Sequence, residues 1–106
     1  MSSLQMPKVD KAIMSKKDKI ALDLRGIINP KNVLSSLDEL RPFETDGLTA
    51  YRQMPLLVVM PETVEEVSQI LKYCNENKIK VVPRGAGTGL SGGSMPLEDC
   101  VLIAMG

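Results

Sequence analysis

The chain contains 106 residues with 13 basic and 13 acidic side chains, so its formal net charge at pH 7 is zero. This length predicts one small domain, and the lack of a basic excess argues against a nucleic-acid-binding protein. The chain contains no histidine, which excludes histidine triads, histidine metal ligands and a histidyl-linked flavin within these residues. Cys74 and Cys100 are too far apart for a CxxC motif, and we expect two ordinary, part-buried thiols in a reducing compartment.

The N-terminal half predicts one amphipathic helix within an otherwise irregular segment. We expect residues 1–14 to form a loosely ordered lead-in and a helix to begin near Ser15. Asn29–Pro30 should end this helix. A short helical turn is expected around residues 33–37, and a surface loop over residues 41–55. The apolar stripe of the helix consists of Ile20, Leu24, Ile27 and Ile28.

Charge is distributed unevenly along the chain. Residues 1–32 carry seven basic and three acidic side chains, a net charge of 7 − 3 = +4, and the remainder balances it. We interpret the basic segment as a solvated helix face. An acidic partner or an anionic membrane surface is the alternative. The longest apolar run is far shorter than the roughly 20 residues that span a bilayer, and no secretory signal is apparent, so no membrane span is predicted.

The second half predicts strands and a helix in alternation. The β-branched run Leu56–Met60, closed by Pro61, is typical of a strand buried on both faces. Thr63 and Glu66 have the spacing of a capping box that opens a helix. Residues 79–83 and 101–105 predict two further strands. The apolar stripe of this helix consists of Val64, Val67, Ile70, Leu71 and Cys74.

These elements predict an α+β fold that is α/β-like: a small parallel sheet built around a βαβ unit and preceded by an N-terminal helix. Strand, helix and strand over roughly 28 residues form a βαβ unit, which requires parallel pairing and a right-handed crossover. Three short strands and one or two helices leave apolar sheet surface uncovered, and Gly106 directly follows an apolar strand. We therefore expect an incomplete domain, the N-terminal fragment of a longer protein.

The most informative segment lies between the second and third predicted strands. Five of the eleven residues of Arg84–Ser94 are glycine. Such a density of glycine costs conformational entropy, and it lets successive backbone N–H groups turn inward and bind a phosphate or pyrophosphate. Thr88, Ser91 and Ser94 add hydroxyl donors, and Arg84 adds positive charge.

Two common phosphate-binding motifs do not fit this segment. Gly87, Gly89 and Gly92 satisfy G-x-G-x-x-G, but a dinucleotide-binding Rossmann turn must continue into a helix, and none is predicted here. No lysine follows the glycines in the order of a P-loop. We therefore predict a cradle of backbone amides between two strands, without a helix N-terminus.

The combined motifs resemble a known family. Arg84–Gly93, preceded by Pro61–Val67 and Val81–Pro83, is similar to the FAD-binding domain of the vanillyl-alcohol oxidase (PCMH) type. Asp46–Arg52 and Pro55–Val59 narrow the resemblance to members that oxidise glycolate. It covers residues 37–106 strongly, and it implies a division into an N-terminal helical segment and loop, residues 1–53, and the first part of a PCMH-type domain, residues 54–106.

The resemblance implies that the glycine-rich segment holds the pyrophosphate of FAD. In covalent members of the family, a histidine of this segment is bonded to the flavin. Thr88 lies near that position here, so the resemblance implies that FAD is bound non-covalently. No metal ligand and no catalytic residue is assigned. Tyr51 and Arg52 are candidates for flavin or carboxylate contacts, although packing on the sheet edge is the favoured interpretation. The implied FAD contacts are Arg84, Gly85, Ala86, Gly87, Thr88, Gly89, Gly92, Gly93 and Ser94.

The family's reaction is hydride transfer from the α-carbon of a 2-hydroxy acid to the flavin. The resemblance implies a glycolate dehydrogenase or oxidase, with D-lactate or D-2-hydroxyglutarate dehydrogenase as alternatives, and electron transfer to an iron–sulfur partner subunit. It also implies a cytoplasmic location, with peripheral attachment to the inner membrane through partner subunits as a further option. These residues alone should not turn over substrate. A truncated product that serves only as an interaction piece is the competing hypothesis.

Overall fold

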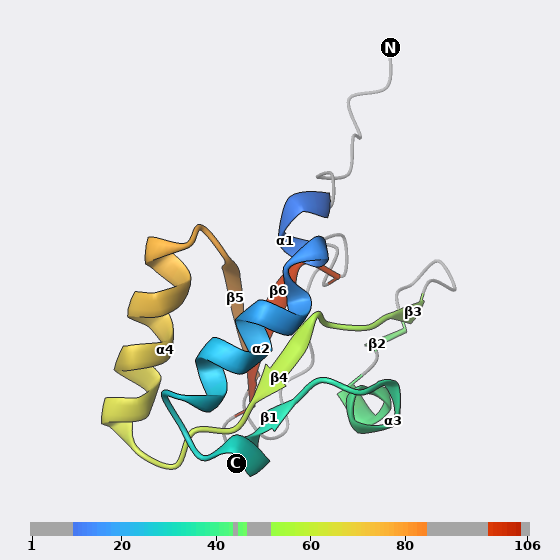
Figure 1. Cartoon of the computed structure of the whole chain (residues 1–106). Helices are drawn as coiled ribbons and strands as arrows, with labels where there is room; N and C mark the ends of the chain where they lie inside the picture. Colours follow the sequence, from blue (N-terminus) through green and yellow to red (C-terminus); the bar gives the residue numbers. More distant parts are fainter. Residues whose placement is uncertain (1–9, 44, 47–51, 85–97, 105–106) are drawn as a thin grey trace.

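Two sheets and several helices make up the computed structural model, which describes residues 10–43, 45–46, 52–84 and 98–104 (Figure 1). The larger sheet has the strand order β1-β4-β6-β5. Its strands are β1 (Val33–Leu34), β4 (Leu57–Val59), β5 (Lys80–Arg84) and β6 (Cys100–Ala104). β1 is antiparallel to β4, whereas β4 and β5 both run parallel to β6. The predicted mixed fold with a small, mostly parallel sheet is confirmed.

The predicted strand–helix–strand unit is present as β4, α4 (Val64–Glu76) and β5. β4 and β5 are not neighbours, however, because β6 lies between them and pairs with both. All three residues of β4 are fully buried, as the β-branched run predicts. β5 forms an edge of the sheet, and it contains Pro83, which has no N–H to donate to a further strand.

The cap of α4 differs in one bond from the prediction. The Thr63 hydroxyl accepts the N–H of Glu66 at 3.1 Å, as expected of an N-cap. The Glu66 carboxylate instead accepts the N–H of Glu62, at 2.7 Å, one residue before the expected donor. The predicted apolar stripe is only partly covered, because Ile70 and Cys74 are buried while Val64 and Leu71 are exposed. α4 ends before Lys78, whose φ of 58° is left-handed.

The N-terminal part of the chain contains a helix that was not predicted. α1 (Lys11–Ser15) occupies part of the expected lead-in, and α2 (Lys17–Arg25) follows it directly. The helix predicted to begin near Ser15 is α2, which begins two residues later, behind the N-cap residue Lys16. The prediction missed α1, whose N-cap is Asp10: the Asp10 carboxylate accepts the N–H groups of Ala12 and Ile13 at 3.0 and 3.2 Å. α2 ends at Arg25 rather than at Asn29–Pro30. The predicted stripe still faces the core: Ile20, Leu24 and Ile28 are buried, and Ile27 packs against them.

Short elements occupy the two segments for which a helical turn and a surface loop were predicted. The turn expected around residues 33–37 is instead strand β1, followed by α3 (Leu37–Leu40) behind a Ser36–Glu39 capping box. Arg25 holds β1 by donating to the carbonyl of Val33 at 3.3 Å. The loop expected over residues 41–55 contains a short 3-10 helix and the antiparallel strands β2 (Thr45–Asp46) and β3 (Arg52–Gln53). The other 3-10 helix is Pro30–Asn32.

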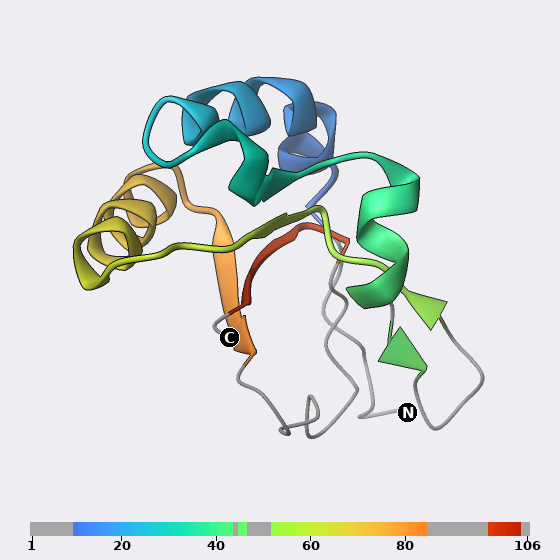
Figure 2. The ribbon, with the colours of Figure 1, turned by 90° about the horizontal axis from the view of Figure 1, so that it is seen from below.

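The two faces of the larger sheet are covered by different elements. α1, α2 and α4 pack on one face, where Leu57, Val59, Val101 and Ile103 join the main core (Figure 2). On the other face, Leu40 of α3 packs against Val58 and Leu102. Alternate residues of β4 and β6 therefore serve opposite faces, as strand geometry requires. Within the described residues, no helix combines the length and the apolar character needed to cross a membrane.

Candidate functional site

The two strands that flank the glycine-rich segment are parallel neighbours. β5 and β6 pair in register from Lys80↔Cys100 to Arg84↔Ala104. The connection between them therefore leaves the sheet at the carboxyl end of β5 and re-enters at the amino end of β6. Open parallel sheets bind ligands beyond the carboxyl ends of their strands, and the glycine-rich segment begins at that edge.

The predicted phosphate contacts are described only at their first residue. Arg84 is the last residue of β5 and pairs with Ala104. The question whether a helix follows the glycines also falls outside the described residues. The other predicted contacts, which lie outside them too, are Gly85, Ala86, Gly87, Thr88, Gly89, Gly92, Gly93 and Ser94.

Two observations fit a pyrophosphate at this connection. Five consecutive residue pairs between β5 and β6 fix the two strands that the connection joins, from Arg84 at the end of β5 to Cys100 at the start of β6. The three parallel strands also end together, since Val59 is in register with Ile103, and Arg84 with Ala104. A glycine-rich backbone anchored in this way can present N–H groups at one edge of a rigid sheet.

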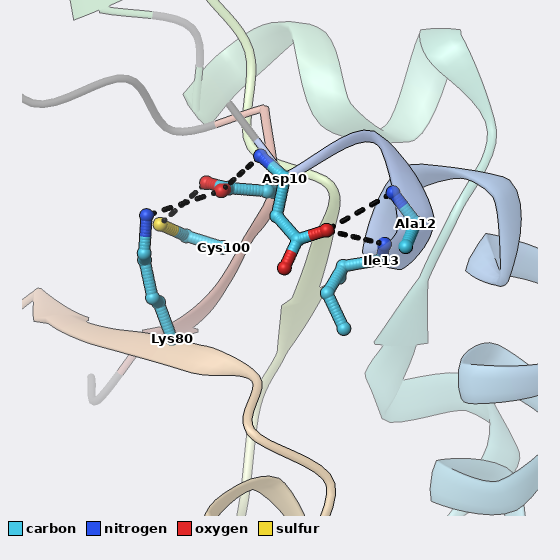
Figure 3. A network of polar contacts seen from close by, with 6 residues as sticks. Asp10, Ala12, Ile13, Lys80 and Cys100 are labelled. Atoms are coloured by element: carbon cyan, nitrogen blue, oxygen red, sulfur yellow. Dashed lines mark hydrogen bonds and ion pairs between the residues drawn. The ribbon is translucent and has the colours of Figure 1, made fainter. Parts of the chain in front are cut away.

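A buried carboxylate lies where the connection re-enters the sheet. Asp99, directly before β6, is 1% exposed and is the one buried charged residue among those described. Its Oδ2 atom accepts the backbone N–H of Asp10 at 2.8 Å and pairs with Lys80 Nζ at 3.2 Å (Figure 3). The Cys100 thiol donates to Oδ1 at 3.5 Å. Burial raises the pKa of Asp99, but the bonds from Asp10, Lys80 and Cys100 outweigh it and hold the pKa below its usual value.

The sequence did not reveal this network. Asp10 and Asp99 are 89 residues apart, and no motif links them. An acidic residue directly before an apolar strand was the available signal, but such residues are usually exposed. Three segments meet at Asp99: the cap of α1, the first residue of β5 and the first residue of β6.

Both cysteines are completely buried, more so than predicted. Burial raises the pKa of Cys74 to about 11. Burial, with the adjacent Asp99 carboxylate, raises the pKa of Cys100 to about 12. A cysteine acts as a nucleophile or a metal ligand in its thiolate form. With raised pKa values, both thiols should stay protonated at neutral pH and react slowly. Among the described residues, no group of three or more His, Cys, Asp or Glu could hold a metal ion.

A cavity of about 150 Å³ lies between α1, α2 and the C-terminal end of α4. Lys16, Lys19, Tyr73 and Asn77 line it together with three isoleucines. Its lining includes Ile79, directly before β5, so the cavity is near the amino end of that strand. No predicted FAD contact lines it.

The two loop candidates are placed only in part. Arg52 belongs to β3 and pairs with Asp46 across the small hairpin, whereas Tyr51 is not among the described residues. A flavin or carboxylate contact from either residue stays a prediction.

Comparison with known proteins gives consistent results. A family model described as an FAD binding domain matches residues 55–106. The glycolate oxidase subunit GlcD of Escherichia coli K12 is 43% identical over 99% of this chain and 21% of its own length. The mitochondrial D-2-hydroxyglutarate dehydrogenase of Arabidopsis thaliana is 40% identical over 77% of this chain and 15% of its own length. The chain thus spans about a fifth or less of these relatives.

Solved structures share the fold. A structure of p-cresol methylhydroxylase with substrate bound superposes with a TM-score of 0.72 and 25% identity, over 92% of this chain and 19% of that one. An alkyldihydroxyacetonephosphate synthase superposes with a TM-score of 0.63 at 17% identity, over 99% of this chain and 21% of that one. The second similarity supports the fold alone.

Proposed function

This chain belongs to the FAD-binding domain family, and from that premise we propose that its glycine-rich connection holds the pyrophosphate of a non-covalently bound FAD. The observation that carries the proposal is that two neighbouring parallel strands, β5 and β6, are joined by a segment with five glycines in its sequence, which leaves the sheet at the carboxyl end of β5. The backbone amides of residues 85–89 and 92–94 would bind the phosphate oxygens. Arg84 would add charge, and hydroxyls of Thr88 and Ser94 would add donors.

The absence of histidine supports a non-covalent cofactor, since no residue here can form the histidyl bond to flavin. Affinity would therefore depend on the backbone cradle and on whatever further contacts the isoalloxazine and adenine groups receive. Residues of this chain would bind and orient the cofactor, and none of the described side chains is assigned as a proton acceptor or a substrate ligand.

We further propose that the chain forms the first part of a flavoprotein that oxidises a 2-hydroxy acid. Bound FAD would supply the hydride acceptor for the α-carbon. Relatives named for glycolate, D-2-hydroxyglutarate and D-lactate support this substrate class. Glycolate is favoured because the relative named for it matches over 99% of this chain. We also propose that the whole protein passes its electrons to an iron–sulfur partner subunit and is located in the cytoplasm.

Flavin content of a full-length protein that contains this chain tests the cofactor proposal. We expect Gly87→Val and Gly89→Val to abolish FAD retention, because a β-branched side chain would block the inward N–H groups. Gly26→Ala is the matched control outside the segment, since its new Cβ would meet only the Asp23 carbonyl, at 3.4 Å. Unchanged flavin content in both valine variants would contradict the cradle.

A chimera extends the test to activity. We would replace the matching 21% of the E. coli glycolate oxidase subunit with this chain and measure flavin content and oxidation of glycolate, D-lactate and D-2-hydroxyglutarate. A yellow, active chimera that loses both properties on Gly89→Val supports the proposal. The competing hypothesis of a non-catalytic interaction piece predicts a chain that self-associates and binds no FAD.

A further inference from the structure

The cavity of about 150 Å³ between α1, α2 and the end of α4 has an apolar floor. Ile13, Ile20 and Ile79 line it, and each is at most 7% exposed and belongs to the main core. A cavity of roughly this volume lined by apolar side chains is large enough to hold a molecule such as benzene. The cavity can therefore accept a short branched alkyl group or a single ring.

The other side chains that line the cavity are polar, and two of them carry a positive charge. Lys16 lies between α1 and α2, and Lys19 belongs to α2. Lys19 is paired with Asp23 at 2.9 Å, whereas no acidic side chain among the described residues is paired with Lys16. None of the described residues that line the cavity is acidic. A free ammonium group beside an apolar floor favours a ligand that is both anionic and apolar.

Most of the polar rim is held in place before any ligand binds. The Asp23 carboxylate accepts the Tyr73 hydroxyl at 2.6 Å and the Lys19 ammonium at 2.9 Å through the same oxygen. The Asn77 side-chain amide donates to the backbone carbonyl of Tyr73 at 2.8 Å. It keeps a second N–H for a ligand, since a carboxamide has two. Fixed side chains of this kind lower the entropy cost of binding.

We propose that this cavity binds a small monocarboxylic acid with a compact apolar group. The apolar group would pack against the three isoleucines, and the carboxylate would pair with the ammonium group of Lys16. The free N–H of Asn77 would donate a further hydrogen bond to the carboxylate. The inference uses no contact with FAD and does not rest on the proposed function.

Isovalerate is the probe, because it joins a carboxylate to a branched alkyl group. We would add it to a full-length protein that contains this chain with isotopically labelled isoleucine methyl groups, and follow their NMR signals. We expect saturable shifts at Ile13, Ile20 and Ile79, with a Kd on the order of 1 mM. Ile103 of β6 belongs to the same core but does not line the cavity, so its signal should stay unchanged.

Two analogues separate the contribution of charge from that of apolar surface. Isovaleramide keeps the shape of the probe but is neutral, and we expect it to bind about fivefold more weakly. Acetate keeps the charge but lacks most of the alkyl group. We expect it to bind at least about tenfold more weakly, because little of it can be buried against the isoleucines.

A pair of lysine variants assigns the charge to one residue. Lys16→Met removes the ammonium group and keeps most of the side-chain stem. We expect it to weaken isovalerate binding about fivefold and to leave isovaleramide binding unchanged. Lys11→Met is the matched control, because Lys11 is an exposed lysine of α1 that does not line the cavity. Lys16 is exposed too, so both variants should fold.

Three results would overturn the proposal. The first is the absence of saturable shifts at the three isoleucines. The second is equal weakening by Lys16→Met and Lys11→Met, because long-range charge would then explain both. The third is an equal shift at Ile103, which would report a change of the whole core. None of these results depends on FAD retention, which Gly87→Val and Gly89→Val test separately.

Discussion

The two faces of the larger sheet differ in how completely they are buried. Among the described residues, the face covered by α1, α2 and α4 gathers fourteen buried residues into one core. The opposite face gathers three, Leu40, Val58 and Leu102, within a rim of partly buried side chains such as Phe43 and Met60. Within the part of the chain that the structure describes, stability should therefore depend chiefly on the helical face.

The largest effect is expected on the helical face. Leu24 is completely buried on α2, and we expect Leu24→Ala to lower the free energy of unfolding by about 4 kcal/mol, since it removes apolar burial and leaves a cavity. Leu22 is the control on the same helix, because it is 70% exposed. Chemical denaturation of both variants measures the difference. Equal losses would mean that α2 does not pack on the sheet as described.

An intermediate effect is expected on the opposite face. Leu40 is 1% exposed, but its neighbours form a small cluster that can close around a cavity. We expect Leu40→Ala to lower the free energy of unfolding by about 2 kcal/mol, near the low end for such truncations. The same denaturation experiment measures it. A loss as large as that of Leu24→Ala would remove the proposed difference between the faces.

The smallest effect concerns pH. The hydrogen bond from Tyr73 and then the one from Lys19 hold the pKa of Asp23 below its usual 3.8. A lowered folded-state pKa contributes stability that is present above the unfolded value and is lost as pH falls through the folded value. The difference in melting temperature between the unaltered chain and Asp23→Asn should therefore shrink from pH 6 to pH 3. A difference that grows toward pH 3 would reverse the sign.

The sequence predicted the parts of the fold whose signals are local. β4, β5, β6 and α4 follow from apolar runs and from the Thr63 cap. It missed β1 and the β2–β3 hairpin because two-residue strands are too short to show alternation. Val64 and Leu71 match the helical period of α4, yet they are exposed, because burial depends on what packs against a helix as well as on its spacing.

The candidate site shows the same limit. The glycine-rich connection could be found from composition, since its function would depend on backbone geometry that only glycine permits. Asp99 could not be found, because its partners come from positions 10 and 80 and are brought together only by the pairing of β5 and β6. Polar contacts between residues so far apart produce no repeating pattern in a single sequence from which they could be predicted.

The position of β6 has a consequence for biosynthesis. Among the described strands, β6 comes after β4 and β5 in the sequence but lies between them in the sheet, so β4 and β5 have no strand between them until residues 100–104 have emerged from the ribosome. Contacts that close over a long stretch of sequence form slowly, and exposed strand edges invite misassembly in the meantime. The nascent chain should therefore need protection by chaperones until this central strand has been synthesised.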